Sequence, residues 1–174
     1  MKNNLIISFE NGVTVSIEDE DVDVDARMTP DKTAISVSQL VGLTKLFNNI
    51  CKTSKYNESD ISDLENDLNF KLGPKSKELL LNVGSLKIGD FEIKNSSGIV
   101  DLTNEWKSTV AKDDEKDRFI VIEADGPDYT LIDDQDMIFV YDGKEKKTES
   151  YDEDVITHIA KHFMSKIVGD EYDY

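Results

Sequence analysis

Alternating apolar and polar positions at the start of the chain predict a β-hairpin. Residues 5–10 and 13–16 alternate in this way on either side of Asn11-Gly12. The Asn-Gly pair is typical of a type I′ turn, because both central positions of that turn need a positive φ. The alternation continues through Val22 and Val24. If this stretch is extended, its acids from Asp21 onward lie on the face opposite these valines.

The period changes to helical spacing between about residue 37 and residue 51, where Ser36 or Ser38 can cap the helix. Cys51 is expected to pack at the end of the apolar face of this helix. Residues 52–58 are polar and are predicted to form a linker. Because an isolated hairpin is marginal in water, residues 1–56 are interpreted as a small β-hairpin-plus-helix module packed on the rest of the protein or on a partner.

The segment from residue 57 onward begins with two predicted helices. Ile61, Leu64 and Leu68 have helical spacing, and Ser59 or Asp60 can cap the first helix. Gly73-Pro74 opens the second, since proline suits the first helical position, and Gly84 suits the position after its end.

The rest of this segment alternates between predicted strands and helices. A short strand is expected at 91–93 and a short helix at 103–110. The uninterrupted apolar run 119–122 predicts a central strand. Strands at 129–133, 137–141 and 148–151 then form an antiparallel meander. A helix at 153–168 and an acidic tail at 169–174 complete an α+β domain over residues 57–168.

The net charge is the feature of the composition that says most about the kind of partner this chain binds. The 174 residues include 37 Asp and Glu but only 20 Lys and Arg, which gives a net charge of −17. This charge argues against direct nucleic-acid binding and favours a basic protein partner. With no long apolar run and no visible signal peptide, the chain is expected to be cytoplasmic, with no membrane association.

Two groups of residues have a spacing that suggests metal binding, and neither completes a motif. Asp21, Asp23 and Asp25 match the start of an EF-hand loop, but its required glycine and final glutamate are absent. His158 and His162 lie one helical turn apart without the glutamate of a metalloprotease helix. We therefore expect no metal, no cofactor and no enzymatic activity, and the oligomeric state stays open.

Several segments resemble the SUKH superfamily over about residues 58–168. Residues 61–72 are similar to its opening helix, and Gly73-Pro74 to its proline step, with Pro74 one place late. Residues 79–84 resemble the end of the second helix, 119–133 the central hairpin, with Pro127 in place of a glycine, and 137–142 the next strand. Residues 1–56 match no segment of the family.

The resemblance implies a SUKH-like domain with an antiparallel meander sheet and flanking helices. It also implies a non-enzymatic protein-binding module, most simply an immunity-type protein, an antitoxin that neutralises a toxin such as a nuclease. The alternative is a phage- or virus-encoded protein, either a nucleic-acid mimic that inhibits a host defence protein (an anti-defence role) or a virion component. A regulatory or scaffold role is a third possibility.

Candidate partner-binding residues follow from the acid excess and from the aromatic side chains. The hairpin ends of the meander are expected to present their side chains to solvent, although a turn favours Asp in any case. Trp106 is either an anchor or a core residue packed with Leu102 and Val110. The candidate set is Asp128, Tyr129, Asp133, Asp134, Asp136, Trp106, Glu18, Asp19, Glu20 and Asp21.

Overall fold

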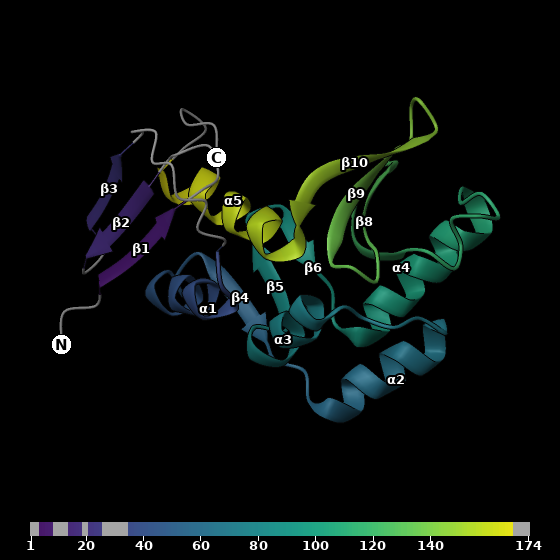
Figure 1. Ribbon diagram of the computed structural model, residues 1–174, viewed down its shortest axis with the longest axis horizontal. Coiled ribbons are helices and arrows are strands. Elements are labelled where there is room, and N and C mark those ends of the chain that lie inside the picture. The colour runs from purple at the N-terminus through teal and green to yellow at the C-terminus, as the bar shows by residue number, and fades with distance from the viewer. Residues whose placement is uncertain (1–3, 9–13, 19–20, 26–34, 169–174) are drawn as a thin grey trace.

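The computed structural model describes residues 4–8, 14–18, 21–25 and 35–168 (Figure 1). The elements, in chain order, are β1 (Asn4–Ser8), β2 (Thr14–Glu18), β3 (Asp21–Asp25), α1 (Val37–Leu46), β4 (Cys51–Ser54), α2 (Glu58–Leu68), α3 (Pro74–Asn82), β5 (Ser85–Ile88), β6 (Phe91–Ile93), α4 (Ser96–Thr109), β7 (Ile120–Asp125), β8 (Asp128–Ile132), β9 (Met137–Asp142), β10 (Lys147–Asp154) and α5 (Val155–Val168). The predicted α+β class is confirmed.

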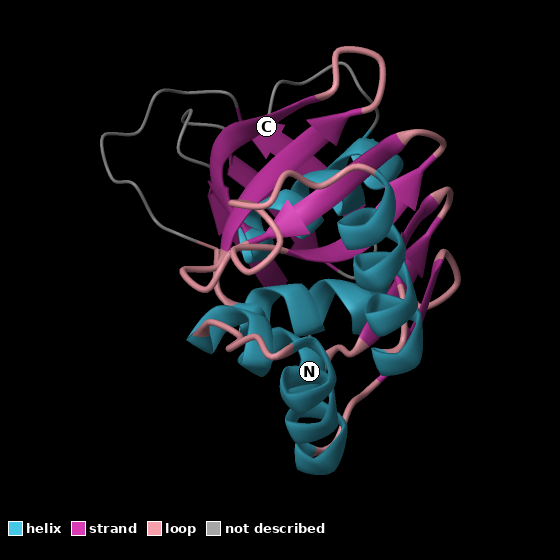
Figure 2. Cartoon of the chain, turned by 90° about the vertical axis from the view of Figure 1, so that its right-hand side faces the viewer, coloured by secondary structure: helices cyan, strands magenta, loops and turns pink. Residues whose placement is uncertain are grey.

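The strands of the described residues form three antiparallel sheets, with the orders β1-β2-β3, β4-β5-β6 and β10-β9-β8-β7. The predicted meander is therefore present. In Figure 2 the strands gather in the upper half of the view and most helices in the lower half.

The meander separates two groups of buried side chains. On one face, Ile120, Ile132 and Ile138 join the main core, to which α1, α2, α3, β5, β6 and α5 also contribute. On the other face, Val121 and Leu131 belong to a second, aromatic core beneath α4. Strand β7 is thus covered on both faces, as its uninterrupted apolar run indicates.

The prediction that β7 is central in its sheet is wrong, because it lies at the edge next to β8 alone. An apolar run reports burial of both faces of a strand and says nothing about the number of hydrogen-bonded neighbours. The outer edge of β7 lies near β6, where the carboxylate of Glu123 accepts a hydrogen bond from the N–H of Glu92 at 3.4 Å.

Residues 35–54 pack with the main core. Leu40 and Leu43 of α1 are fully buried, and Gln39 Nε2 donates to the carbonyl oxygen of Ile6 at 2.8 Å, which ties α1 to β1. Helix α1 ends at Leu46, earlier than predicted, and Cys51 begins β4 instead of ending the helix. The predicted linker 52–58 therefore contains most of a strand.

The starts of α1, α2 and α4 are set by side-chain caps, and the cap of α2 differs from the predicted residues. Ser36 caps α1 in a capping box with Gln39. Helix α2 is capped by Asn57, paired with Asp60, in place of Ser59 or Asp60. Helix α4 begins seven residues before the predicted start at 103, with Asn95 as its cap. Both Asn57 and Asn95 cap with a side-chain oxygen, because Asn satisfies helix N–H groups as well as Ser does.

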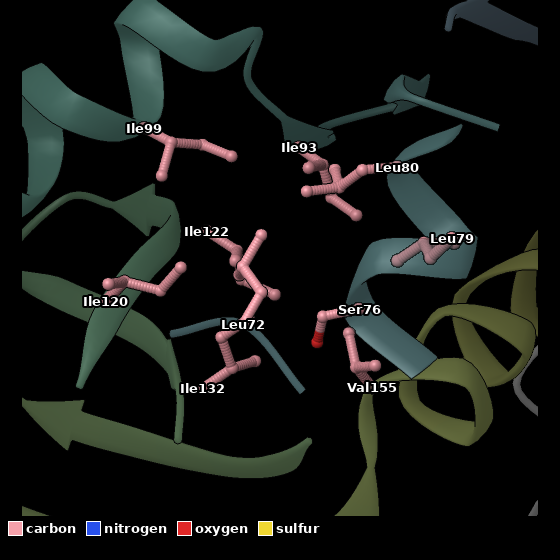
Figure 3. A pocket seen from close by; sticks show the side chains of 10 residues that line it. All are labelled: Leu72, Ser76, Leu79, Leu80, Ile93, Ile99, Ile120, Ile122, Ile132 and Val155. Atoms are coloured by element: carbon pink, nitrogen blue, oxygen red, sulfur yellow. The ribbon is translucent and has the colours of Figure 1, made fainter. Parts of the chain in front are cut away.

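The centre of the main core leaves a cavity of only about 10 Å³ between α3, β6, α4, β7, β8 and α5 (Figure 3). Its walls are leucine, isoleucine and valine side chains, apart from Ser76. A space this small holds at most one water, so it offers no room for a ligand.

Gly84 gives the first test of this packing. Its φ is +81°, and a Cβ there would lie 1.9 Å from the carbonyl oxygen of Ser54. We expect Gly84→Ala to lower the free energy of unfolding by at least about 2 kcal/mol, since a positive φ alone costs an L-residue about 1–2 kcal/mol. Urea denaturation measures this loss.

Gly126→Ala is the matched control, because Gly126 also has a positive φ but no atom within 4 Å of the added Cβ. We expect it to lose only the conformational part, about 1 kcal/mol. Equal losses in the two variants would contradict the close approach of Gly84 to Ser54.

Candidate partner-binding surface

The turn between β8 and β9 is built by aspartates that bind backbone N–H groups. Asp133 Oδ1 accepts hydrogen bonds from the N–H groups of Gln135 at 3.0 Å and Met137 at 2.9 Å. The carboxylate thus replaces backbone partners inside the turn, which is the usual reason for Asp at such positions. Asp134, next to it, is exposed.

Asp136 caps α3 from across the fold. Helix α3 begins after Gly73, which has no side chain to cap it, and Pro74 has no N–H. The N–H groups of Lys75 and Ser76 donate to the Asp136 carboxylate at 3.0 and 2.8 Å, and the Ser76 hydroxyl donates at 2.5 Å. This one carboxylate therefore satisfies helix N–H groups that would otherwise be unpaired.

The expectation that the side chains of this turn reach solvent is wrong for two of its three acids. Asp133 is 8% exposed and Asp136 only 3%. Both are held inside by the N–H groups they bind, so neither carboxylate is free to meet a partner. Asp134 remains accessible.

Trp106 and Tyr129 lie in the aromatic core between α4 and the meander. Trp106 is 0% exposed and meets Phe119 edge-on, with ring centroids 6.3 Å apart. Leu102 and Val110 pack beside it, so the core interpretation of its spacing is the correct one. Tyr129 was expected at the solvent, but it is 8% exposed because its face of β8 points toward α4.

The face of the meander that points away from α4 packs on the main core over one half only. The other half of this face is open and is rich in acids. The register aligns Glu123 with Thr130, Thr130 with Val140, and Val140 with Glu149. The same alternation places five carboxylates on this side of the sheet, which we call the acidic face: Glu123, Asp125, Asp128, Asp142 and Glu149. Asp125 and Glu149 are exposed, and the other three are half-buried.

Three members of the acidic face also support the local backbone. Asp128 Oδ1 accepts from the N–H of Gly143 at 2.8 Å, which joins the two turns at this end of the sheet. The N–H groups of Lys144 and Glu145 donate to Asp142 Oδ1 and hold the pKa of its carboxyl below the usual value. Burial raises the pKa of Glu123, against a hydrogen bond from the Thr130 hydroxyl.

An exposed aromatic side chain borders the acidic face and was missed by the sequence analysis. Tyr151 on β10 is 55% exposed, and its ring stands edge-on to His158 of α5, with centroids 6.1 Å apart. Its position in the last strand of the meander was visible in the sequence. The sequence could not show that Tyr151 faces solvent, because β10 is an edge strand whose register shifts between Ser150 and Asp154.

The acidic run near the N-terminus lies only partly within the described residues. Strand β2 ends at Glu18, and β3 runs from Asp21 to Asp25 antiparallel to β2, so the acids from Asp21 to Asp25 lie on an extended strand, as the alternation indicates. Glu18 pairs with Asp21 in the register. Asp19 and Glu20, the Asn11-Gly12 turn and the acidic tail 169–174 lie outside the described residues.

Two histidines on α5, the buried His158 and the half-buried His162, form a cluster with the half-buried Glu153. His158 Nδ1 lies 2.7 Å from Glu153 Oε1, and its Nε2 lies 3.3 Å from His162 Nε2. Burial opposes ionisation of Glu153, but the contacts with His158 and Lys161 outweigh it and lower the pKa. Burial, together with the neighbouring His158, lowers the pKa of His162 to about 4.

Neither a metal site nor a membrane span is found in the part of the chain that the structure describes. There, no group of three or more His, Cys, Asp or Glu side chains gathers in a way that could hold a metal ion. No helix of the same residues is long and apolar enough to cross a lipid bilayer.

The fold and this surface define an α+β domain with a helix-flanked meander. A family model, SUKH_5, described as SMI1-KNR4 cell-wall, matches residues 44–163. Because this match covers more than half of the chain, the protein belongs to this SUKH family, and the resemblance found in the sequence is confirmed. The match begins at residue 44, so the expectation that residues 1–56 have no counterpart in the family is wrong for residues 44–56. The family is associated with immunity proteins and cell-wall regulators. No curated protein matches the chain.

We expect Asp136→Ala to be the most damaging change in the β8–β9 turn. It leaves the buried N–H and hydroxyl groups of Ser76 and the part-buried N–H of Lys75 without their acceptor, and each unpaired buried group costs roughly 1–3 kcal/mol. The free energy of unfolding should therefore fall by roughly 3 kcal/mol or more in urea denaturation, which measures the loss.

Asp134→Ala is the matched control in the same turn, because its carboxylate is exposed. We expect a change within about 0.5 kcal/mol, as for most surface substitutions. If Asp136→Ala were as mild as this control, Asp136 would not stabilise the start of α3.

The low pKa of His162 predicts a pH dependence of stability. Between pH 6.5, its ordinary pKa, and about pH 4, its value in the fold, the unfolded chain binds a proton that the folded protein does not. Stability should therefore fall as the pH drops through this window. Glu153 has a lowered pKa, so its contribution is lost only below its ordinary value of 4.5.

His162→Phe removes the titrating group and keeps a ring against Phe91, on which His162 stacks with centroids 4.0 Å apart. We expect the loss of stability between pH 7 and pH 5, measured by urea denaturation, to be smaller in this variant. An unchanged pH profile would show that His162 is protonated as easily in the fold as in the unfolded chain.

Proposed function

We propose that the protein is a non-enzymatic, immunity-type module that binds and neutralises a toxin with a basic surface, a nuclease being the simplest case. Membership of the SUKH family supports the class, and the acidic face supports the charge of the partner. Five carboxylates gather there on one sheet, and among the described residues the register adds one cation to the same side, Lys147, which forms an ion pair with Glu149.

The chemistry of this face suits a partner rich in Lys and Arg. Carboxylates at the rim of an interface mainly accelerate association, because they attract a basic partner over a distance. The net charge of −17 adds to this attraction. Tyr151 is the accessible aromatic side chain at the border of the face, and aromatic residues of this kind often dominate binding energy.

The candidate residues drawn from the sequence divide into two groups under this proposal. Asp128 and Asp134 remain contact residues, and Glu18, Asp19, Glu20 and Asp21 form a second acidic segment for the partner. The remaining four residues are buried and support the interface only by holding the sheet and its turns in place: Asp133, Asp136, Trp106 and Tyr129.

The alternative is a phage- or virus-encoded inhibitor of a host defence protein, which would present the same acidic face as a mimic of nucleic acid. The family match favours the immunity role, because the family is associated with immunity proteins. The genes next to the gene for this chain distinguish the two, since an immunity protein is encoded beside its toxin.

The function is tested with the proteins encoded by those adjacent genes. We expect one of them to arrest the growth of a bacterial host and co-expression of this chain to restore growth. Association of the purified pair should slow as salt rises toward 0.15 M, where the Debye length is about 8 Å. If none of these proteins is toxic, or if growth stays arrested, the proposal is wrong.

The interface is tested with variants in the same association measurement. Asp125→Asn with Glu149→Gln should slow association at least about threefold, because it removes two charges that attract the partner. Tyr151→Ala should mainly speed dissociation, by about tenfold or more for an aromatic anchor. Asp63→Asn with Asp67→Asn is the control, since it makes the same change in charge at exposed positions of α2. Equal slowing in the control would remove the acidic face from the interface.

A further inference from the structure

A second charged surface, of the opposite sign, lies on the sheet formed by β4, β5 and β6. One side of this sheet faces the main core through Leu86, Ile88 and Ile93, which are buried. On the other side the register places Lys52 opposite Lys87, and Lys87 opposite Glu92. The solvent side of this sheet is therefore polar and carries cations.

A groove of about 300 Å³ runs over this side of the sheet. We call it the lysine groove, and its polar walls come from all three strands and from the residues that follow β6: Lys52, Ser54, Ser85, Lys87, Glu92 and Lys94. Three ammonium groups thus face one carboxylate in a protein that is otherwise strongly acidic.

The charges in the lysine groove are not balanced by the described residues. Glu92 lies 2.6 Å from Lys94 Nζ and 3.9 Å from Lys87 Nζ, so one carboxylate serves two lysines. Lys52 has no ion-pair partner among the described residues. Like charges directly opposite each other on neighbouring strands repel, so the Lys52–Lys87 pair costs stability in the absence of an anion.

The start of α4 adds to the positive potential at one end of the groove. Asn95, which lines the groove, is the N-cap of this 14-residue helix. The N-terminus of a helix carries about half a positive charge and attracts anions. The first turn of α2 contains Glu58 and Asp60, but the first turn of α4 contains no acid.

We propose that the lysine groove binds a small anion that carries a phosphate group. Lysine binds phosphate as a point charge, and three lysines with a helix N-terminus match a group with two negative charges. A long polyanion such as DNA does not suit the site, because the net charge of −17 repels it beyond the groove. The size of the groove suits inorganic phosphate or a small phosphorylated molecule.

The proposal is tested by following backbone amide resonances while inorganic phosphate is added to the full chain. We expect saturable shifts confined to residues 52–54, 85–87 and 92–98. Sodium chloride at matched ionic strength is the control for screening. Equal shifts with chloride, or shifts spread evenly over the surface, would overturn the proposal.

Two further ligands distinguish the sources of the phosphate group. A nucleoside monophosphate that binds more tightly than inorganic phosphate, at the same residues, would identify a phosphorylated small molecule as the ligand. Equal affinities would identify the phosphate group alone, and both results support the site. A DNA duplex should bind more weakly than either, and tighter binding by DNA would contradict the proposal.

Variants assign the binding to particular lysines. Lys87→Gln, at the centre of the groove, should weaken phosphate binding at least tenfold without lowering thermal stability, because it also removes the repulsion with Lys52. Lys112→Gln makes the same change in charge on the exposed loop after α4 and should have no effect on phosphate binding. Equal weakening in both variants would show a general effect of charge and not a site.

Discussion

Asp136 connects three segments that lie far apart in the chain, through its side chain and its backbone carbonyl. Its oxygens bind the N–H groups at the start of α3, 60 and 61 residues upstream, and its backbone carbonyl accepts from the N–H of Val155 at 2.9 Å. Lys75 Nζ, 2.5 Å from Asp154, adds an ion pair between the same two helix starts. The position of the β8–β9 turn therefore sets the positions of α3 and α5.

Gly73 makes this arrangement possible. A Cβ at Gly73 would lie 2.4 Å from the Asp136 carboxylate, so any other residue would displace the acid from the start of the helix. Once α3 and α5 are held, the main core fills the space between them and the meander. The sheet is thereby covered over one half of this face, and the other half is left open as the acidic face.

Secondary structure could largely be predicted from the sequence, because most elements carry a clear period. Helix α5 and the strands of the meander were predicted within a few residues of their bounds. Strand β5 was missed, since Ser85–Ile88 is too short to show a period. The prediction that β7 is a central strand was wrong because an apolar run shows that a strand is buried and does not show how many strands pair with it.

The candidate surface could be predicted less well, since the sequence does not distinguish an Asp that caps a helix from an Asp that is exposed to solvent. Asp133, Asp134 and Asp136 are alike in the sequence, yet only Asp134 is exposed. The difference depends on N–H groups that come from α3, which no local pattern connects to this turn. The lysine groove was missed for the same reason, because Lys52 lies more than thirty residues before Lys87 and Lys94 and no local pattern connects it to them.

The two charged surfaces are joined at β6. The N–H of Glu92 donates to Glu123 of the acidic face, while the Glu92 side chain pairs with lysines of the groove. An anion bound in the groove would neutralise Lys52 and Lys87 and would make the field of the protein more negative. It would then strengthen the attraction of a basic partner to the acidic face, and by linkage the partner would strengthen the binding of the anion. Because the anion would add negative charge and the basic partner positive charge to the same protein, the two proposed sites would support each other and would not compete.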